Sequence, residues 1–189
     1  MKLNKGFKVK MGDWESMIYG GPYSNFDPQE RRLFGVKMAV EIEHPHDLSI
    51  PTRDYSIPSV EILIDGLKEV FRQIRLGKDI YVGCMGGVGR TGLFMGCLLK
   101  CVDRFYEMDD VPVEVIISRV RTWYNPHAIE TKEQGKFIEQ LDVKEVVEFM
   151  HKLYDTRVKE VVKEVEKEVV VVKYQTFWEW VLRFWGFGK

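Results

Sequence analysis

Apolar positions recur at helical spacing through the middle and later parts of the chain. One helix with a single apolar face is predicted over residues 59–76, and Gly77 ends it. Further helices are predicted over about residues 91–105, over 113–123, and from 131 to at least 151. Helices therefore account for most of the second half of the predicted domain.

Strand patterns are shorter and lie earlier in the chain. Apolar and polar residues alternate over residues 35–43, which predicts a strand, and a short apolar run predicts a buried strand over 79–83. Residues 7–20 are strand-like but irregular. Asp27, followed at once by proline, predicts the N-cap of a short helix. Residues 44–58 contain three prolines and are predicted to form a loop.

The order of these elements predicts an α/β domain with helices packed on a central sheet. We expect this domain to cover residues 1–153 and a C-terminal extension to cover 154–189. Valines in the extension recur at spacings of four and three, as in a short heptad seam, and an aromatic stretch follows. The valines are Val158, Val162, Val165, Val169 and Val172, and the aromatic stretch is Phe177-Trp178-Glu179-Trp180-Val181-Leu182-Arg183-Phe184-Trp185.

Two roles are open for this extension. It is expected to pack on the domain or on a second copy of the chain. The alternative is a helix lying in a membrane interface, since tryptophans share one helical face, but only Arg183 and Lys189 are basic there. Membrane contact is therefore not expected.

Composition adds limits on partners and compartment. The 189 residues carry a net charge of −1 and no basic block, so no nucleic acid partner is expected. The three cysteines lack the spacing of a disulfide framework, and Cys97 and Cys101 are expected to be core residues. The sequence shows no apolar signal segment and no apolar run of about 20 residues. A reducing, cytoplasmic location is the expectation.

One segment between a predicted strand and a predicted helix combines a thiol, glycines and an arginine. It reads Cys84-Met85-Gly86-Gly87-Val88-Gly89-Arg90-Thr91-Gly92. A glycine-rich turn of this kind directs backbone N–H groups at an anion, and the following helix N-terminus adds positive potential. Arg90 adds a planar fork for two oxygens, and the same dipoles stabilise a thiolate at Cys84. The segment predicts a nucleophile held in a phosphate-binding loop.

This segment resembles the signature Cys-x5-Arg-[Ser/Thr] of the protein tyrosine phosphatase superfamily. Its glycines at 87 and 89 and its Thr91-Gly92 resemble the dual-specificity and small archaeal-type branches. The resemblance extends over roughly residues 15–142 and implies a central, mostly parallel sheet flanked by helices. It also implies a phosphocysteine intermediate. No cofactor and no metal are expected, because Arg90 and the loop amides would stabilise the negative charge on the phosphoryl oxygens.

The resemblance also implies catalytic roles. Cys84 attacks phosphorus, Arg90 holds the phosphoryl oxygens, and the Thr91 hydroxyl hydrogen-bonds the sulfur. Asp54, thirty residues before Cys84 and four before a proline, is the predicted general acid and then the base for the attacking water. Asp47, which lacks the proline pattern, is the alternative acid.

Two features depart from the family pattern. Residues 128–134 resemble the glutamine loop that positions the hydrolytic water, but Glu130 stands at the first glutamine position and only Gln134 matches. The same segment also fits a helix start, with Thr131 and Gln134 as a capping box. Gly83 stands where most relatives carry a histidine that helps organise the cysteine loop.

The predicted substrate-binding residues are those of the loop and one downstream glutamine. They are Met85, Gly86, Gly87, Val88, Gly89, Arg90 and Gln134. The variable loop positions are not basic, whereas relatives that cleave phosphoinositides tend to carry lysines there. A phosphorylated protein is therefore the expected partner, with phosphotyrosine preferred to phosphoserine or phosphothreonine. The alternatives are a phosphate-binding module without turnover, or a phosphatase for RNA 5′-triphosphate or phosphoinositide.

Overall fold

The computed structural model describes residues 6–108, 111–156 and 160–165. The chain divides into two units, Met1–His151 and Lys152–Lys189. The first unit contains the sheet, the helices that pack on it and all the predicted site residues. The domain boundary expected after residue 153 stays a prediction.

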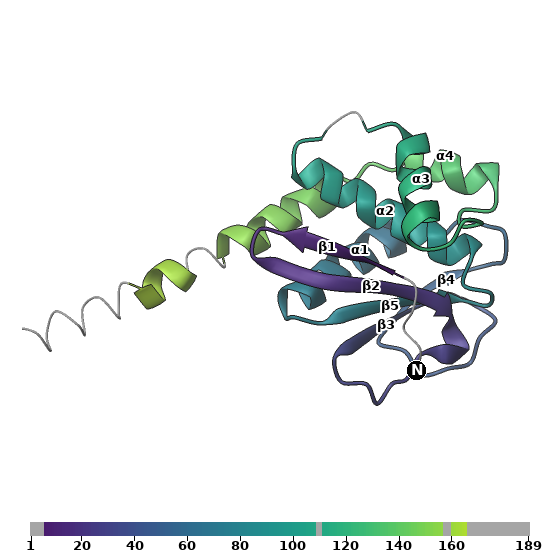
Figure 1. Ribbon diagram of the computed structural model, residues 1–189, viewed down its shortest axis with the longest axis horizontal. Coiled ribbons are helices and arrows are strands. Elements are labelled where there is room, and N and C mark those ends of the chain that lie inside the picture. Colours follow the sequence, from purple (N-terminus) through teal and green to yellow (C-terminus); the bar gives the residue numbers. More distant parts are fainter. Residues whose placement is uncertain (1–5, 109–110, 157–159, 166–189) are drawn as a thin grey trace, which may run out of the picture. The chain divides into compact units, whose positions relative to one another are not determined.

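A five-stranded sheet forms the centre of the first unit (Figure 1). Its strands are β1 (Gly6–Met11), β2 (Trp14–Pro22), β3 (Leu33–Ala39), β4 (Leu48–Thr52) and β5 (Asp79–Cys84). Their order is β1-β2-β5-β3-β4. Only the β1–β2 pair is antiparallel, and the other three pairs are parallel. The mostly parallel sheet expected from the resemblance is confirmed.

Two helices contact the strands of this sheet, and two further helices pack on the second of them. They are α1 (Val60–Arg75), α2 (Gly89–Phe105), α3 (Val113–Trp123) and α4 (Lys132–Gln140). Figure 1 shows them gathered on one side of the sheet. Their positions agree with the helical spacing in the sequence, except that the helix predicted from 131 to 151 is interrupted. Residues 141–143 are not helical, and the Asp142 carboxylate accepts a hydrogen bond from the Lys144 amide as a second helix begins.

Aromatic rings cover the opposite side of β5. Tyr23, in the short 3₁₀ helix η1 (Tyr23–Asn25), and Phe26 pack against each other and against Tyr81 of β5. Glycines in the adjoining strands leave room for these rings: a Cβ at Gly35 would lie 2.6 Å from the Tyr23 hydroxyl oxygen. A Cβ at Gly83 would lie 2.8 Å from the Tyr23 Cα. The absence of a histidine at position 83 therefore has a packing cause.

The expectations for residues 27–58 were partly wrong. Residues 27–32 form turns instead of a helix: the Asp27 carboxylate accepts a hydrogen bond from the Gln29 amide, and Leu33 already pairs with β5. Strand β3 thus starts and ends earlier than predicted. Strand β4 lies inside the predicted loop and contains Pro51. Proline is tolerated there because β4 is an edge strand, which leaves one side of the backbone unpaired.

The second unit is described only in part. Residues 152–156 and 160–165 are helical, and Val161, Val162 and Val165 are exposed. The remainder of the predicted heptad seam and the aromatic stretch lie outside the described residues. Within the described part of the chain, no helix has the length and apolar character needed to cross a membrane.

We predict that Gly83→Ala lowers the free energy of unfolding by about 1–3 kcal/mol, the usual cost of overpacking a filled core. The added Cβ would lie 2.8 Å from the Gly21 carbonyl oxygen as well as from Tyr23. Urea unfolding measures the change. Gly135→Ala is the matched control, because its Cβ would meet only Ile117, at 3.5 Å, and should be neutral or stabilising in α4. Equal stabilities of the two variants would contradict the packing argument.

Candidate active site

The predicted nucleophile lies at the carboxyl end of the central strand. Strand β5 has a parallel neighbour on each side, ends at Cys84, and pairs Pro22 of β2 with Cys84. Cys84 is 3% exposed and forms no disulfide. The carboxyl ends of parallel strands meet at one edge of a sheet, where loops gather and ligands bind. The fold therefore places the thiol at this edge, directly before the N-terminus of α2.

The four residues between Cys84 and α2 form a tight turn against strand β2. Gly87 has φ of +68°, which favours glycine, and a Cβ there would lie 2.6 Å from the Gly21 Cα. Met85 points outward and is 54% exposed, whereas Gly87 and Gly89 are buried. The loop predicted from the sequence is therefore present as a continuous turn, with its glycines where backbone segments approach closely.

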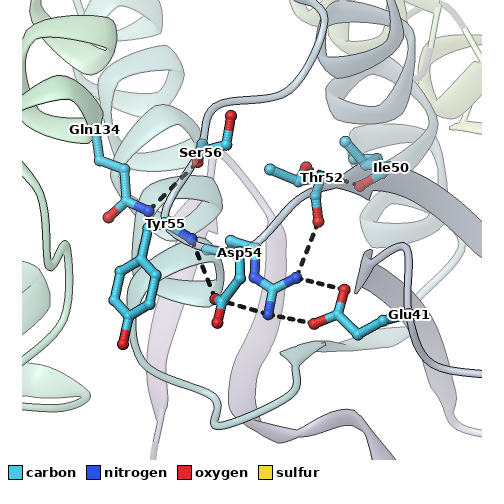
Figure 2. Close-up of polar contacts among 8 residues, drawn as sticks. Glu41, Ile50, Thr52, Asp54, Tyr55, Ser56 and Gln134 are labelled. Atoms are coloured by element: carbon cyan, nitrogen blue, oxygen red, sulfur yellow. Dashed lines mark hydrogen bonds and ion pairs between the residues drawn. The ribbon is translucent and has the colours of Figure 1, made fainter.

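Arg90, in the first turn of α2, is 2% exposed and paired with two carboxylates. Its Nη1 donates to Glu41 Oε2 at 2.8 Å and to the Thr52 carbonyl at 2.9 Å. Its Nη2 donates to Glu41 Oε1 at 2.6 Å and forms an ion pair with Asp54 Oδ1 at 3.0 Å. Figure 2 shows the Glu41 and Asp54 carboxylates meeting the same guanidinium from different segments of the chain.

These contacts keep the guanidinium charged. Burial alone would lower the pKa of Arg90, but the hydrogen bonds to Glu41 and the nearby acidic groups raise it above its ordinary value. The same hydrogen bonds lower the pKa of Glu41. The pair is therefore ionic in the folded protein, with Glu41 as the acceptor that compensates the buried cation.

Two buried polar groups next to the loop have no partner among the described residues. They are the Nε–H of Arg90 and the hydroxyl of Thr91. An arginine has five N–H groups, and both on Nη1 are used by Glu41 and Thr52. An oxyanion held by the fork of Nε and Nη2 would therefore displace Asp54, which now occupies the Nη2 side.

Asp54 reaches this guanidinium from an exposed turn. Its side chain is 60% exposed, and its Oδ1 also accepts a hydrogen bond from the Tyr55 amide at 3.1 Å. Tyr55 has φ of +56°, an unusual conformation for a residue with a side chain. The alternative acid, Asp47, accepts a hydrogen bond from the Gly35 amide at 2.7 Å and so ties its loop to β3. Of the two aspartates, the structure brings Asp54 to Arg90.

Gln134 and Glu130 lie on the other side of the loop, and their positions differ. Gln134 is fully buried and completes the capping box of α4 with Thr131, and its amide nitrogen donates to the Ser56 carbonyl at 3.4 Å. Glu130 is exposed, and its Oε2 occupies the space where a Cβ of Gly89 would lie. Gln134 thus joins α4 to the Asp54 turn, while a carboxylate lies against the loop.

Glu41 is the site residue that the sequence did not reveal. The alternating pattern predicted that it lies in a strand, but β3 ends at Ala39 and Glu41 lies in the following turn. No motif or spacing marks it as the partner of an arginine 49 residues away.

Cys97 and Cys101 lie inside α2, away from this chemistry. Both are fully buried, and burial raises the pKa of Cys97 to about 12. They are core residues, as expected. Among the described residues, no group of three His, Cys, Asp or Glu side chains is arranged to hold a metal ion.

Comparison with known sequences gives distant relatives. No protein-family model matches the chain. Two uncharacterized proteins of Methanocaldococcus jannaschii, MJECL20 and MJ0215, are 33% and 32% identical to it over 103 residues. Each match covers 51% of this chain, with 62% of the first relative and 57% of the second. The chain therefore spans less than two thirds of the length of either relative.

Solved structures with a similar fold are phosphatases. The active form of Tk-PTP has a TM-score of 0.57 and 24% identity, over 76% of this chain and 99% of that chain. The core catalytic domain of the PP-IP phosphatase SIW14 from S. cerevisiae has a TM-score of 0.51 and 20% identity, over 71% and 87%. Both belong to the cysteine-dependent protein tyrosine phosphatase superfamily. This chain has the fold of that superfamily.

We predict that Glu41→Gln lowers the free energy of unfolding at neutral pH by about 1–3 kcal/mol, because a buried cation loses its ionic partner. The pKa of Glu41 is lowered by folding, so its contribution is complete above its ordinary pKa of 4.5 and is lost as the pH falls toward the lower folded value. Thermal unfolding between pH 3 and pH 7 measures this dependence. Its control is Glu43→Gln, exposed two residues away; equal pH profiles for both variants would argue against the pairing.

Proposed function

We propose that this chain is a phosphatase that hydrolyses phosphorylated proteins, phosphotyrosine above phosphoserine and phosphothreonine, through a phosphocysteine intermediate at Cys84. One observation carries the proposal: the buried guanidinium of Arg90 lies in the first turn of the helix that follows the Cys84 loop, and its Nε–H has no partner among the described residues. A buried, charged donor without an acceptor is costly. A phosphoryl oxygen would supply the acceptor.

The first step transfers the phosphoryl group to sulfur. The Cys84 thiolate attacks phosphorus, the bond from phosphorus to the ester oxygen breaks, and the electron pair leaves with that oxygen. Arg90 and the loop amides hold the equatorial oxygens as their charge spreads. Displaced from Arg90 by the substrate, Asp54 stays in the same turn. In its protonated form it gives its proton to the leaving oxygen and becomes a carboxylate.

The second step releases phosphate. Water attacks phosphorus, the bond between phosphorus and sulfur breaks, and the electron pair returns to Cys84 as a thiolate. Asp54, now a carboxylate, takes the proton from the water. The Thr91 hydroxyl, which is buried and has no partner in the described part of the chain, supports the departing sulfur with a hydrogen bond. The cycle needs no further reactant.

Charge and exposure around the loop support a phosphoprotein substrate. Glu41, Asp54 and Glu130 place three carboxylates around the loop, which disfavours a substrate with several additional phosphates. SIW14 is a PP-IP phosphatase by its name, but the variable loop positions here carry Met85 and Val88 instead of basic residues. Tyr55, next to the proposed acid, is 62% exposed and offers an apolar ring surface to an aryl phosphate.

We predict that Cys84→Ser lowers hydrolysis of p-nitrophenyl phosphate by on the order of a thousandfold or more, because the hydroxyl is a far weaker nucleophile. Orthovanadate should inhibit the wild type by occupying the loop. Steady-state release of p-nitrophenol measures both effects. Cys97→Ala, in the core of α2, should keep its activity. Full turnover by the Cys84→Ser variant would exclude the mechanism, and vanadate binding without turnover by the wild type would indicate a binding module.

We predict that Asp54→Asn has opposite effects on binding and turnover. It removes a competitor for Arg90 Nη2, so orthovanadate should inhibit about two- to tenfold more tightly. It also removes the acid, so turnover of phenyl phosphate should fall by about 10²-fold or more, and that of p-nitrophenyl phosphate by less, because p-nitrophenolate leaves without help. The control is Asp47→Asn, which should retain turnover. Weaker vanadate inhibition in Asp54→Asn would contradict the competition.

A further inference from the structure

Tyr124 forms a buried contact with the phosphate loop that the proposed mechanism does not use. It is the C-cap residue of α3, its side chain is 6% exposed, and its hydroxyl donates a hydrogen bond to the carbonyl of Gly87. The two residues are 37 positions apart. Burial is the largest cause that raises the pKa of Tyr124, and the nearby Cys84 adds to it, so the hydroxyl keeps its proton as a donor.

Two adjacent glycines of β2 make this contact possible. A Cβ at Gly20 would lie 2.7 Å from the ring of Tyr124, and a Cβ at Gly87 would lie 2.6 Å from the Cα of Gly21. The ring packs on Gly20 while the loop packs on Gly21. The loop at Gly87 therefore lies against strand β2, and its carbonyl accepts from the buried Tyr124 hydroxyl.

The direction of this carbonyl matters for anion binding. In a trans peptide the C=O and the following N–H point in opposite directions. Fixing the Gly87 carbonyl toward Tyr124 therefore directs the Val88 N–H the other way. Without the bond, glycine gives this peptide unit little resistance to rotation, and a reversed unit would present a carbonyl oxygen to the phosphate.

No side chain at position 83 helps to hold the phosphate loop, because the residue there is glycine. Gly83 lies against Gly21 and Tyr23, so the strand before the nucleophile has no room for a residue that could reach the loop. The anchor comes instead from α3. Arg121, one turn earlier on α3, donates to the carbonyls of Ala128 and Ile129 and so holds the segment that carries Glu130.

We propose that Tyr124 is a positioning residue for the phosphate loop: its hydroxyl holds the Gly87 carbonyl away from the anion and the Val88 N–H toward it. This inference rests on the proposed phosphatase function. It concerns the binding of the oxyanion by the loop and a residue that the proposed mechanism does not use. It predicts that removing one hydroxyl oxygen from the core weakens oxyanion binding without altering the nucleophile, the arginine or the acid.

Tyr124→Phe keeps the ring on Gly20 and removes only the hydroxyl. We expect orthovanadate to inhibit this variant about two- to tenfold less tightly than the wild type, the range for loss of one hydrogen bond. A parallel fall in kcat/KM for p-nitrophenyl phosphate is expected. The matched control is Tyr23→Phe, which also removes a buried hydroxyl, but one without a partner among the described residues. It should leave vanadate inhibition unchanged.

Thermal unfolding separates positioning from a general loss of stability. A Tyr124→Phe variant that is less stable but inhibited like the wild type would overturn the inference, as would an equal loss of inhibition in Tyr23→Phe. Turnover by the wild type and its loss in Cys84→Ser test the proposed function separately.

A measurement on the wild type tests the same inference if Tyr124→Phe does not fold. The Val88 amide proton of the ¹⁵N-labelled chain should move downfield in an NMR titration with orthophosphate, as it gains a charged acceptor. A Val88 resonance that stays unchanged at saturating phosphate would overturn the inference, whether or not the chain turns over substrate.

Discussion

A guanidinium with 2% exposure is stable only if acceptors compensate its desolvation, and this requirement organises the site around Arg90. Glu41 follows β3, Thr52 ends β4 and Asp54 lies in the turn after it. Glu41 and the Thr52 carbonyl accept hydrogen bonds from Arg90, and Asp54 forms an ion pair with it. The contacts tie the start of α2 to the far half of the sheet. They leave the Arg90 Nε–H without a partner among the described residues, and in the proposed function an oxyanion would bind there and displace Asp54 from Nη2.

Close backbone packing is the second constraint on the loop. Gly21 lies against Gly87 and Gly83, and Gly20 accommodates the Tyr124 ring. Together these glycines let β2, β5 and the loop approach more closely than residues with side chains allow. Rings of Tyr23 and Phe26 then fill the space beside Gly83 and Gly35. The shape of the loop thus depends on its neighbours as much as on its own glycines.

Predictions from the sequence were right where the pattern is local and long. The helices α1, α2 and α3 have several turns of apolar periodicity, and β5 is a continuous buried run. They were wrong where pairing partners decide. Asp27 and its proline have the local marks of a helix start, but β3 begins six residues later because it pairs with β5. Edge strand β4 was read as a loop because its proline is tolerated only on an unpaired edge.

The sequence by itself determined the loop, its thiol, its arginine and the candidate acid, because these residues lie within one turn or in a short motif whose spacing reflects the chemistry. It did not reveal Glu41 as the partner of Arg90, or Tyr124 as the partner of Gly87, because neither residue belongs to a motif. Contacts across 49 and 37 positions arise only when the sheet and α3 are assembled. Tertiary structure also shows where the two candidate acids lie: Asp54 beside Arg90, and Asp47 bound to the Gly35 amide, where it ties its loop to β3.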